Sequence, residues 1–338
     1  MSKVGVLGAG SWGIALATVL AANGHDVKVW SIMEDEVEML RTHHEHQTKL
    51  PGVKLADNIT YTTKIEEAIV GKEMVVFAVP STFIRSTAKS AAPYVEQGQL
   101  LVNVAKGIEE STLMPMVDII EQEIPKAVVA VLSGPSHAEE VGRGLPTTVV
   151  AGAKKKSTAE KIQTYFMNQV FRVYTSPDVL GLELGGSLKN VIALAAGMAD
   201  GMGFGDNTKA ALITRGISEI TQLGLKMGAK AETLSGLSGI GDLIVTCASV
   251  HSRNRKAGML IGQGKTRQEA MDEVKMVVEG VYSAKAAALL GKKYGVELPI
   301  TEEVNRVLFE DVPAKEGVQN LMMRERKAES EKLAWEQE

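Results

Sequence analysis

The feature that most constrains the fold of this chain is a glycine-rich turn close to its first residue. Val4–Leu7 has the apolar character of a short buried strand, and Ile14–Leu20 has that of a helix. Between them, Gly8, Gly10 and Gly13 form the pattern G-x-G-x-x-G. A strand, this turn and a helix in that order are typical of a fold that binds dinucleotides, and a glycine-rich turn without a ligand is the alternative.

Each glycine has a predicted task in such a turn. We expect Gly8 to permit the tight turn, Gly10 to let the backbone approach a pyrophosphate, and Gly13 to let the helix pack closely on the strand. The pyrophosphate would lie at the helix N-terminus, where the helix dipole is positive and the N–H groups of Ser11 and Trp12 are candidates to bind it.

The second predicted strand, Asp26–Trp30, leaves the choice of dinucleotide open. A carboxylate at the end of this strand holds the ribose of NAD, and an arginine nearby accommodates the 2′-phosphate of NADP. The strand is followed by Ser31, Ile32 and Met33, which supply neither group, and acidic residues begin only at Glu34. We therefore expect the cofactor to be NAD or NADP.

Alternating strand-like and helix-like segments predict an α/β fold in the first half of the chain. The predicted strands are Val4–Leu7, Asp26–Trp30, Met74–Ala78, Leu100–Asn103, Val128–Leu132 and Thr147–Ala151. Helices between most of them favour a Rossmann-like, doubly wound parallel sheet. Beyond Ser176 no convincing strand follows, so an all-helical domain is expected. We predict a dinucleotide-binding domain over 1–178, a helical substrate and catalytic domain over 179–324, and a charged tail over 325–338.

Composition narrows the kind of protein. With 338 residues, two domains are the natural expectation, and the net charge of −4 argues against a nucleic-acid partner. Cys247 is the only cysteine, which excludes an internal disulfide and fits a reducing cytosol. The first strand starts too early for a signal peptide. The longest apolar run, Val191–Ala199, is too short to cross a bilayer. We expect a cytoplasmic protein without membrane insertion.

Three histidines near the end of the second predicted helix look at first like metal ligands. His43, His44 and His46 match no standard zinc spacing. We expect a solvated loop or helix end there, and no metal site.

Two loops that follow predicted strands carry candidate binding residues. The carboxyl ends of parallel strands line the ligand crevice, so Lys106, after Leu100–Asn103, is a candidate to face cofactor and substrate. A surface lysine is the alternative. Gly134 and Ser136 follow the strand Val128–Leu132, where small residues would expose backbone N–H groups and a hydroxyl to a polar ligand. A purely structural turn is almost equally compatible with this pattern.

Lys189 is the strongest candidate for catalysis. It leads into a markedly apolar helical stretch, where a lysine is uncommon unless its charge has a partner. Burial lowers the pKa of a lysine, and such a lysine can act as a general acid or base. Asp242 could accept its hydrogen bond and orient it. A lysine whose tip reaches solvent is the alternative.

A third cluster resembles an anion site. Ser252, Arg253 and Asn254 together present hydrogen-bond donors suited to a phosphate. The alternative for Arg253 and Arg255 is an exposed, charged helix start.

Nine sequence blocks in a fixed order carry a family resemblance. They are GAGSWGIALA, LPGVKL, FAVPS, AKGIE, LSGPSHAEEV, GGSLKNVIALAAGMADGMGFGDNTKAALITRG, GLSGIGDLIVTC, SRNR and VVEG, between Lys3 and Arg324. In these blocks the chain resembles the NAD(P)-dependent glycerol-3-phosphate dehydrogenases of the bacterial type. One departure is that the family often carries an arginine where this chain has Ile32 and Met33.

The resemblance implies roles for individual residues. Lys189 would be the proton donor or acceptor, with Lys106 and Asp242 as its catalytic companions. The implied cofactor contacts, with the three glycines of the turn, are Ser11, Trp12, Lys106, Ala138, Arg253, Val277 and Glu279. The implied substrate contacts are Lys106, Gly134, Ser136, Lys189, Asn190, Asp242, Ser252, Arg253 and Asn254.

The resemblance also implies an activity and an assembly. The expected reaction is hydride transfer from NADH or NADPH to dihydroxyacetone phosphate, which gives sn-glycerol 3-phosphate for glycerophospholipid synthesis. A homodimer formed through the helical domain is expected. A related hydroxy-acid dehydrogenase and a non-catalytic dinucleotide sensor are the alternatives.

Overall fold

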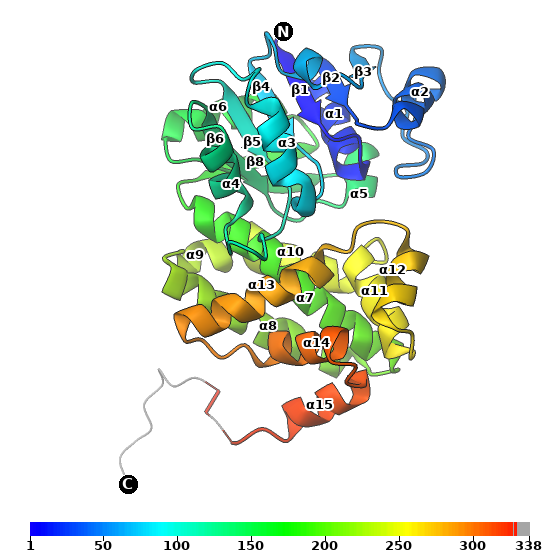
Figure 1. Cartoon of the computed structure of the whole chain (residues 1–338), viewed down its shortest axis with the longest axis vertical. Helices are drawn as coiled ribbons and strands as arrows, with labels where there is room; N and C mark the ends of the chain where they lie inside the picture. Colours follow the sequence, from blue (N-terminus) through cyan, green and yellow to red (C-terminus); the bar gives the residue numbers. More distant parts are fainter. Residues whose placement is uncertain (327, 330–338) are drawn as a thin grey trace.

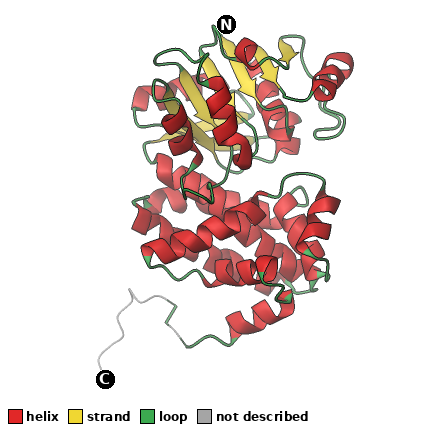
Figure 2. Cartoon of the chain, in the orientation of Figure 1, coloured by secondary structure: helices red, strands yellow, loops and turns green. Residues whose placement is uncertain are grey.

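The chain folds into a sheet-containing half followed by a helical half. The structure is a computed structural model that describes residues 1–326, 328 and 329. Figure 1 shows the two halves stacked along the longest axis, and Figure 2 shows the strands confined to one of them. Most of the predicted charged tail, 327 and 330–338, lies outside the described residues.

One sheet forms the centre of the first half. In the described part of the chain it has eight strands in the order β3-β2-β1-β4-β5-β6-β7-β8. Neighbouring strands are parallel except β6 and β7, which are antiparallel. The strands are β1 (Lys3–Leu7), β2 (Asp26–Trp30), β3 (Ile59–Thr62), β4 (Met74–Phe77), β5 (Leu100–Asn103), β6 (Val128–Ser133), β7 (Thr147–Gly152) and β8 (Phe171–Ser176).

The sequence analysis correctly predicted the doubly wound sheet but missed two of its strands and the direction of a third. β3 has only four residues, and β8 alternates between buried and exposed side chains. Both lie at the edges of the sheet, where a strand needs no continuous apolar run. β7 runs antiparallel to β6, so the sheet is mixed rather than wholly parallel.

Helices cover both faces of the sheet, because its central strands are apolar on both sides. Val4 and Val6 face one core, which α1, α5 and α6 cover, and Leu7, Val75 and Phe77 face the other, under α3 and α4. The helices and 3₁₀ turns of this half are α1 (Ser11–Ala22), α2 (Glu34–His43), η1 (Ile65–Ala68), η2 (Ser81–Phe83), α3 (Ile84–Ala91), α4 (Met116–Glu123), α5 (Ala138–Gly142) and α6 (Lys156–Phe166).

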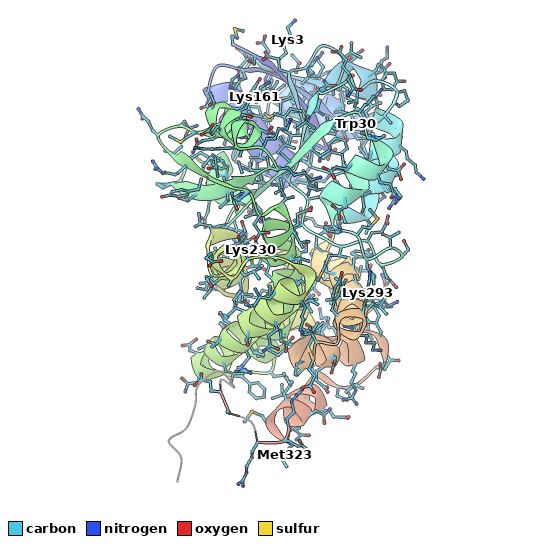
Figure 3. The ribbon with its side chains drawn as sticks, turned by 90° about the vertical axis from the view of Figure 1, so that its left-hand side faces the viewer. Lys3, Trp30, Lys161, Lys230, Lys293 and Met323 are labelled. Carbon is cyan, nitrogen blue, oxygen red and sulfur yellow. The ribbon has the colours of Figure 1, made fainter. Side chains whose placement is uncertain are left out.

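The regular elements of the second half are all helices among the described residues, as predicted. Figure 3 shows Lys293 and Met323 in this half, Lys3, Trp30 and Lys161 in the other, and Lys230 near their junction. Its elements are α7 (Val179–Gly201), α8 (Asp206–Met227), α9 (Ala231–Leu234), η3 (Leu237–Gly241), α10 (Asp242–Ala248), α11 (Arg253–Gly262), α12 (Arg267–Val274), α13 (Glu279–Tyr294), α14 (Pro299–Phe309) and α15 (Ala314–Met322).

Helix α7 is the core of the helical half. Glycines allow α11 to approach it closely, since a Cβ at Gly197 would lie 2.1 Å from the carbonyl oxygen of Arg255 and one at Gly258 would lie 2.1 Å from that of Leu194. By length and composition α7 is sufficient to cross a membrane. The apolar run Val191–Ala199, which the sequence analysis judged too short, is only part of this longer helix. However, 89% of its most apolar window is buried within the protein. Burial of this extent is typical of a core helix.

Candidate active site

A cavity of about 980 Å³ lies where the two halves meet. It runs along the carboxyl ends of β1, β2, β4 and β5 and is closed by α7, α11 and the start of α13. Gly13, Gly134 and Asp242 do not line it, although the last two bind a side chain that does. The other residues assigned to the site all line it: Gly8, Gly10, Ser11, Trp12, Lys106, Ser136, Ala138, Lys189, Asn190, Ser252, Arg253, Asn254, Val277 and Glu279.

The glycine-rich turn at one end of the cavity has the geometry that the sequence predicted. Gly8 has φ +118°, and a Cβ there would lie 2.7 Å from the carbonyl carbon of Ala78. A Cβ at Gly13 would lie 2.0 Å from the carbonyl oxygen of Gly8, whereas one at Gly10 would meet no atom within 4 Å. The backbone at Gly10 is therefore open to a close approach from the cavity.

The start of α1 supplies the matching electrostatics. Its first turn has no acidic residue, and no side chain caps its N-terminal N–H groups. The indole Nε1 of Trp12 finds no hydrogen-bond partner in the described part of the chain. Free N–H groups at a positive helix end fit the pyrophosphate of a dinucleotide.

The end of β2 differs from the sequence-based expectation, because it does hold a carboxylate. Glu36, in the first turn of α2, is buried and accepts hydrogen bonds from the hydroxyl of Ser31, the ring Nε2 of His46 at 2.8 Å, and the ammonium group of Lys49. Glu36 and Lys49 both line the cavity, near the exposed Ile32. The chain after β2 therefore places the carboxylate of Glu36 and the ammonium group of Lys49 at the end of this strand, although neither residue follows the strand directly in sequence.

The same cluster corrects the expectation for the histidines. His46 is buried and 1% exposed, so it belongs to no solvated loop, whereas His43 and His44 are exposed. Burial alone would raise the pKa of Glu36, but hydrogen bonds from His46, Lys49 and Ser31 lower it to about 2. Glu36 is therefore ionised at neutral pH. Among the described residues, no group of three or more potential ligands could hold a metal ion.

Lys106 projects from the loop after β5 into the middle of the cavity. Its Nζ donates to the carbonyl oxygen of Gly134 at 2.9 Å, to the hydroxyl of Ser136 at 3.3 Å and to the carboxylate of Asp242 at 2.7 Å. Its side chain is 18% exposed, so it is not a surface lysine. The loop after β6 thus binds the ammonium group of Lys106 directly.

Lys189 is buried and paired in the way its position in an apolar helix suggested. Its Nζ donates to the carboxylate of Asp242 and, at 2.7 Å, to the hydroxyl of Thr246. Asp242 and Thr246 lie on α10, which follows the wide, π-type turn Leu237–Gly241. A Cβ at Gly185 would lie 2.5 Å from the carbonyl oxygen of Ser238, so glycine on α7 lets this turn approach.

One carboxylate therefore serves two ammonium groups. Burial, together with the nearby charge of Lys106, lowers the pKa of Lys189 to about 7 against the opposing effect of Asp242. Burial would raise the pKa of Asp242, but the two lysines hold it below its usual range. Lys189 can consequently gain or lose a proton near neutral pH, which is the property required of a general acid or base.

The donors expected to bind a phosphate separate into two groups. Arg253, at the start of α11, lines the cavity and makes no hydrogen bond or ion pair within the described part of the chain. Arg255 instead bonds Asp200 at 2.6 Å. The side-chain amide of Asn254 donates to Asn190 at 2.9 Å. The guanidinium of Arg253 interacts electrostatically with the carboxylate of Glu279 but has its N–H donors available for an anion in the cavity.

Ser252 and Glu279 have partners within the protein as well. The hydroxyl of Ser252 accepts the backbone N–H of Arg255 at 3.2 Å and caps α11. The carboxylate of Glu279 accepts the backbone N–H of Ser81 at 3.0 Å and also its hydroxyl, which joins α13 to the end of β4. Burial raises the pKa of Glu279.

Several cavity residues were not found by sequence reasoning. Glu36, Lys49 and Thr246 were not singled out, and His137 lines the cavity with them. The ring of His137 lies 6.1 Å from that of His251, and its Nε2 has no partner among the described residues. Thr246 follows Asp242 by one helical turn, and this spacing could have suggested it.

A dinucleotide turn and a titratable lysine within one cavity between two domains place the chain in the class of dinucleotide-dependent oxidoreductases. The two profiles that describe the N-terminus and the C-terminus of NAD-dependent glycerol-3-phosphate dehydrogenase match residues 3–159 and 178–319. The chain belongs to this family.

Individual relatives agree with this assignment. A glycerol-3-phosphate dehydrogenase [NAD(P)+] from Agathobacter rectalis is 70% identical over 99% of this chain and 100% of its own. One from Fusobacterium nucleatum is 57% identical over 97% and 99%. The crystal structure of glycerol-3-phosphate dehydrogenase from Coxiella burnetii is 34% identical, with a TM-score of 0.92, over 96% of this chain and 99% of that one.

Proposed function

We propose that this chain interconverts dihydroxyacetone phosphate and sn-glycerol 3-phosphate with NAD(H) or NADP(H), and that it supplies glycerol 3-phosphate for phospholipid synthesis. The observation that carries the substrate assignment is the guanidinium of Arg253, which lies in the same cavity as Lys189 and makes no hydrogen bond or ion pair with the described residues. One group suits a phosphate and the other a carbonyl oxygen that becomes an alkoxide. Residues 1–178 would bind the dinucleotide, and 179–324 would contribute most of the substrate contacts.

In the proposed reaction, one set of residues binds the dinucleotide and another set binds the substrate. Gly8, Gly10, Ser11 and Trp12 would hold the dinucleotide, with Gly13 behind them, and further contacts would come from Lys106, Ala138, Arg253, Val277 and Glu279. A bound reduced nicotinamide supplies the hydride for carbon 2 of the ketone. The residues Lys106, Gly134, Ser136, Lys189, Asn190, Asp242, Ser252, Arg253 and Asn254 would bind the substrate.

Lys189 is the proposed general acid. Its ammonium group would stabilise the negative charge that develops on the carbonyl oxygen and then donate a proton to it, which leaves a neutral amine and a secondary alcohol. Asp242 would keep Lys189 and Lys106 in place throughout. In the oxidation direction, the neutral amine of Lys189 would accept the proton of the hydroxyl.

The direct test is an assay with dihydroxyacetone phosphate and either NADH or NADPH, alongside unphosphorylated dihydroxyacetone. We expect turnover of the phosphorylated substrate with at least one cofactor. Turnover of 2-keto acids instead would indicate a different hydroxy-acid dehydrogenase, and cofactor binding without turnover of any substrate would indicate a sensor. A homodimer in the cytoplasm, without membrane insertion, is the proposed state, and light scattering of the purified protein tests the dimer.

A further inference from the structure

Glu183 is a buried carboxylate at the junction of the two halves, outside the set of residues assigned to the reaction. It lies in the second turn of α7, is 5% exposed, and does not line the cavity. Its Oε1 accepts the backbone N–H of Val117 at 2.9 Å and the side-chain amide of Asn103 at 3.2 Å. The backbone N–H of Met116 is a further donor. These donors come from β5 and from the start of α4.

The carboxylate has no cation to pair with in the described part of the chain. Burial raises the pKa of Glu183 to about 8, against the opposing effect of its hydrogen-bond donors. A buried carboxylate held only by hydrogen bonds is a costly group. A role in placing its donors would explain why a carboxylate stands there.

One of those donors leads to Lys106. Asn103 is completely buried and is the last residue of β5. Its amide nitrogen also donates to the carbonyl oxygen of Ala105 at 3.0 Å, and its amide oxygen accepts the backbone N–H of Ala105 at 3.1 Å. Because Oε1 of Glu183 accepts hydrogen bonds from both the Asn103 amide and the backbone N–H of Val117, the nitrogen side of the amide faces Glu183. The amide then closes the turn immediately before Lys106.

Helix α7 holds the same loop at a second point. Ser187, one turn after Glu183, donates to the carbonyl oxygen of Gly107 at 3.1 Å. A Cβ at Gly186 would lie 3.4 Å from Cγ of Lys106, so the stem of the lysine passes over this glycine. The loop is thus held on both sides of Lys106 by the helix that also carries Lys189.

We propose that Glu183 is a positioning residue for the reaction: through Asn103 it sets the turn that presents Lys106 to Gly134, Ser136 and Asp242. This inference rests on the proposed function. According to this proposal, the position of Lys106 depends on a carboxyl group that touches neither substrate nor cofactor. The remaining bonds of Glu183, to the start of α4, contribute stability but not position.

Glu219 provides a matched control. It is also a buried carboxylate near a helix start, and it accepts the backbone N–H of Ile300 at 2.6 Å and the hydroxyl of Thr301 at 3.0 Å. Burial raises its pKa to about 7. Neither Glu219 nor its partners line the cavity. Replacing Glu219 therefore removes a buried carboxyl group that caps a helix, α14, but leaves Lys106 and its contacts intact.

The experiment is a double-mutant cycle on the full chain. kcat/KM for dihydroxyacetone phosphate is measured per NADH-binding site for wild type, Glu183→Ala, Lys106→Met and the double variant, and Glu219→Ala is the control. We expect Glu183→Ala to lower kcat/KM at least about tenfold in the wild-type background and less than about twofold in the Lys106→Met background. Glu219→Ala should lower thermal stability but change kcat/KM by less than about twofold.

Two results would overturn the proposal: wild-type kcat/KM in Glu183→Ala, or equal losses in both backgrounds. If Glu183→Ala does not fold, Glu183→Asp replaces it, since the shorter side chain keeps the carboxyl group but withdraws it from Asn103. The Asp variant should lose at least about fivefold in kcat/KM, and unchanged kinetics would likewise overturn the proposal. Failure of the proposed function is separate, because wild type itself would then not turn over dihydroxyacetone phosphate.

Discussion

Lys189 and Asp242 form an ion pair that is buried between α7 and α10, and Lys106 binds the other oxygen of the same carboxylate. The side chains of Lys189 and Asp242 are 7% and 1% exposed. Two ammonium groups and one carboxylate leave a net positive charge in a site of low solvent access. Positive charge held in such surroundings stabilises a developing alkoxide more strongly than it would in water.

The first prediction concerns pH. If Lys189 must be protonated to reduce the ketone, kcat/KM for dihydroxyacetone phosphate should fall as pH rises through the lysine's pKa of about 7. Above that pH the loss should approach about tenfold per pH unit. For oxidation of glycerol 3-phosphate, kcat/KM should instead rise over the same interval. Steady-state kinetics in both directions between pH 6 and 9 measures this.

Asp242→Asn tests the direction in which Asp242 shifts the pKa of Lys189. The carboxylate of Asp242 raises the pKa of Lys189 against the lowering effect of burial. Its removal should therefore move the fall in reductive kcat/KM to lower pH, by about one unit or more. A fall that stays in place, or moves to higher pH, would show that another group is the acid.

The second prediction concerns the phosphate. Charged hydrogen bonds contribute about 1.5–3 kcal/mol, so Arg253→Ala should lower kcat/KM for dihydroxyacetone phosphate about tenfold or more. The loss for unphosphorylated dihydroxyacetone should be much smaller. Arg255→Ala is the matched control, because that guanidinium binds Asp200. Equal losses for the two substrates in Arg253→Ala would show that Arg253 does not bind the phosphate.

The third prediction concerns the choice between NAD and NADP. The carboxylate of Glu36 suits a ribose hydroxyl, and the ammonium group of Lys49, which binds it, suits a 2′-phosphate. With both at one place, we expect kcat/KM for NADH and NADPH to differ by less than about 100-fold. Lys49→Met should lower kcat/KM for NADPH more than kcat/KM for NADH. Glu36→Gln should shift the ratio of the two kcat/KM values towards NADPH.

Ile32→Arg provides an independent test at the same end of the cavity. The side chain of Ile32 is 80% exposed, so an arginine there needs no repacking. Its guanidinium should shift the preference towards NADPH, because it can bind the 2′-phosphate with two hydrogen bonds. A wild-type preference above about 1000-fold in either direction would contradict this interpretation of the strand end.

Local sequence was sufficient wherever a residue's role depends on its own segment. Gly8, Gly10 and Gly13 act within one turn, and Lys189 is conspicuous inside an apolar helix. Sequence could not predict Glu36, since its place at the cavity results from the turn that brings the start of α2 back to Ser31. For the same reason it could not predict His46, whose partner is ten residues away along the chain.

The sequence analysis also failed to predict an edge strand of the sheet and contacts between residues that are far apart in the chain. β8 has no continuous apolar run and alternates between buried and exposed residues, which is the pattern of a half-buried strand paired on one side with β7, and the sequence analysis did not recognise it. The resemblance placed Asp242 beside the substrate, and only the structure shows that it binds Lys106 and Lys189 together. The link from Glu183 to Lys106 depends on a contact across 80 residues, for which the sequence contains no local signal.

The most direct test of the account is the loss of Lys189. Lys189→Ala is compared with wild type in kcat for dihydroxyacetone phosphate and in the Kd for NADH. Lys209→Ala is the control, because Lys209 is paired with Asp200 at 2.9 Å and does not line the cavity. Loss of a general acid alone should lower kcat by about 10²–10⁴-fold, with the Kd for NADH unchanged. A Lys189→Ala variant that keeps about a third of wild-type kcat would contradict the account, because Lys189 would then not be the acid.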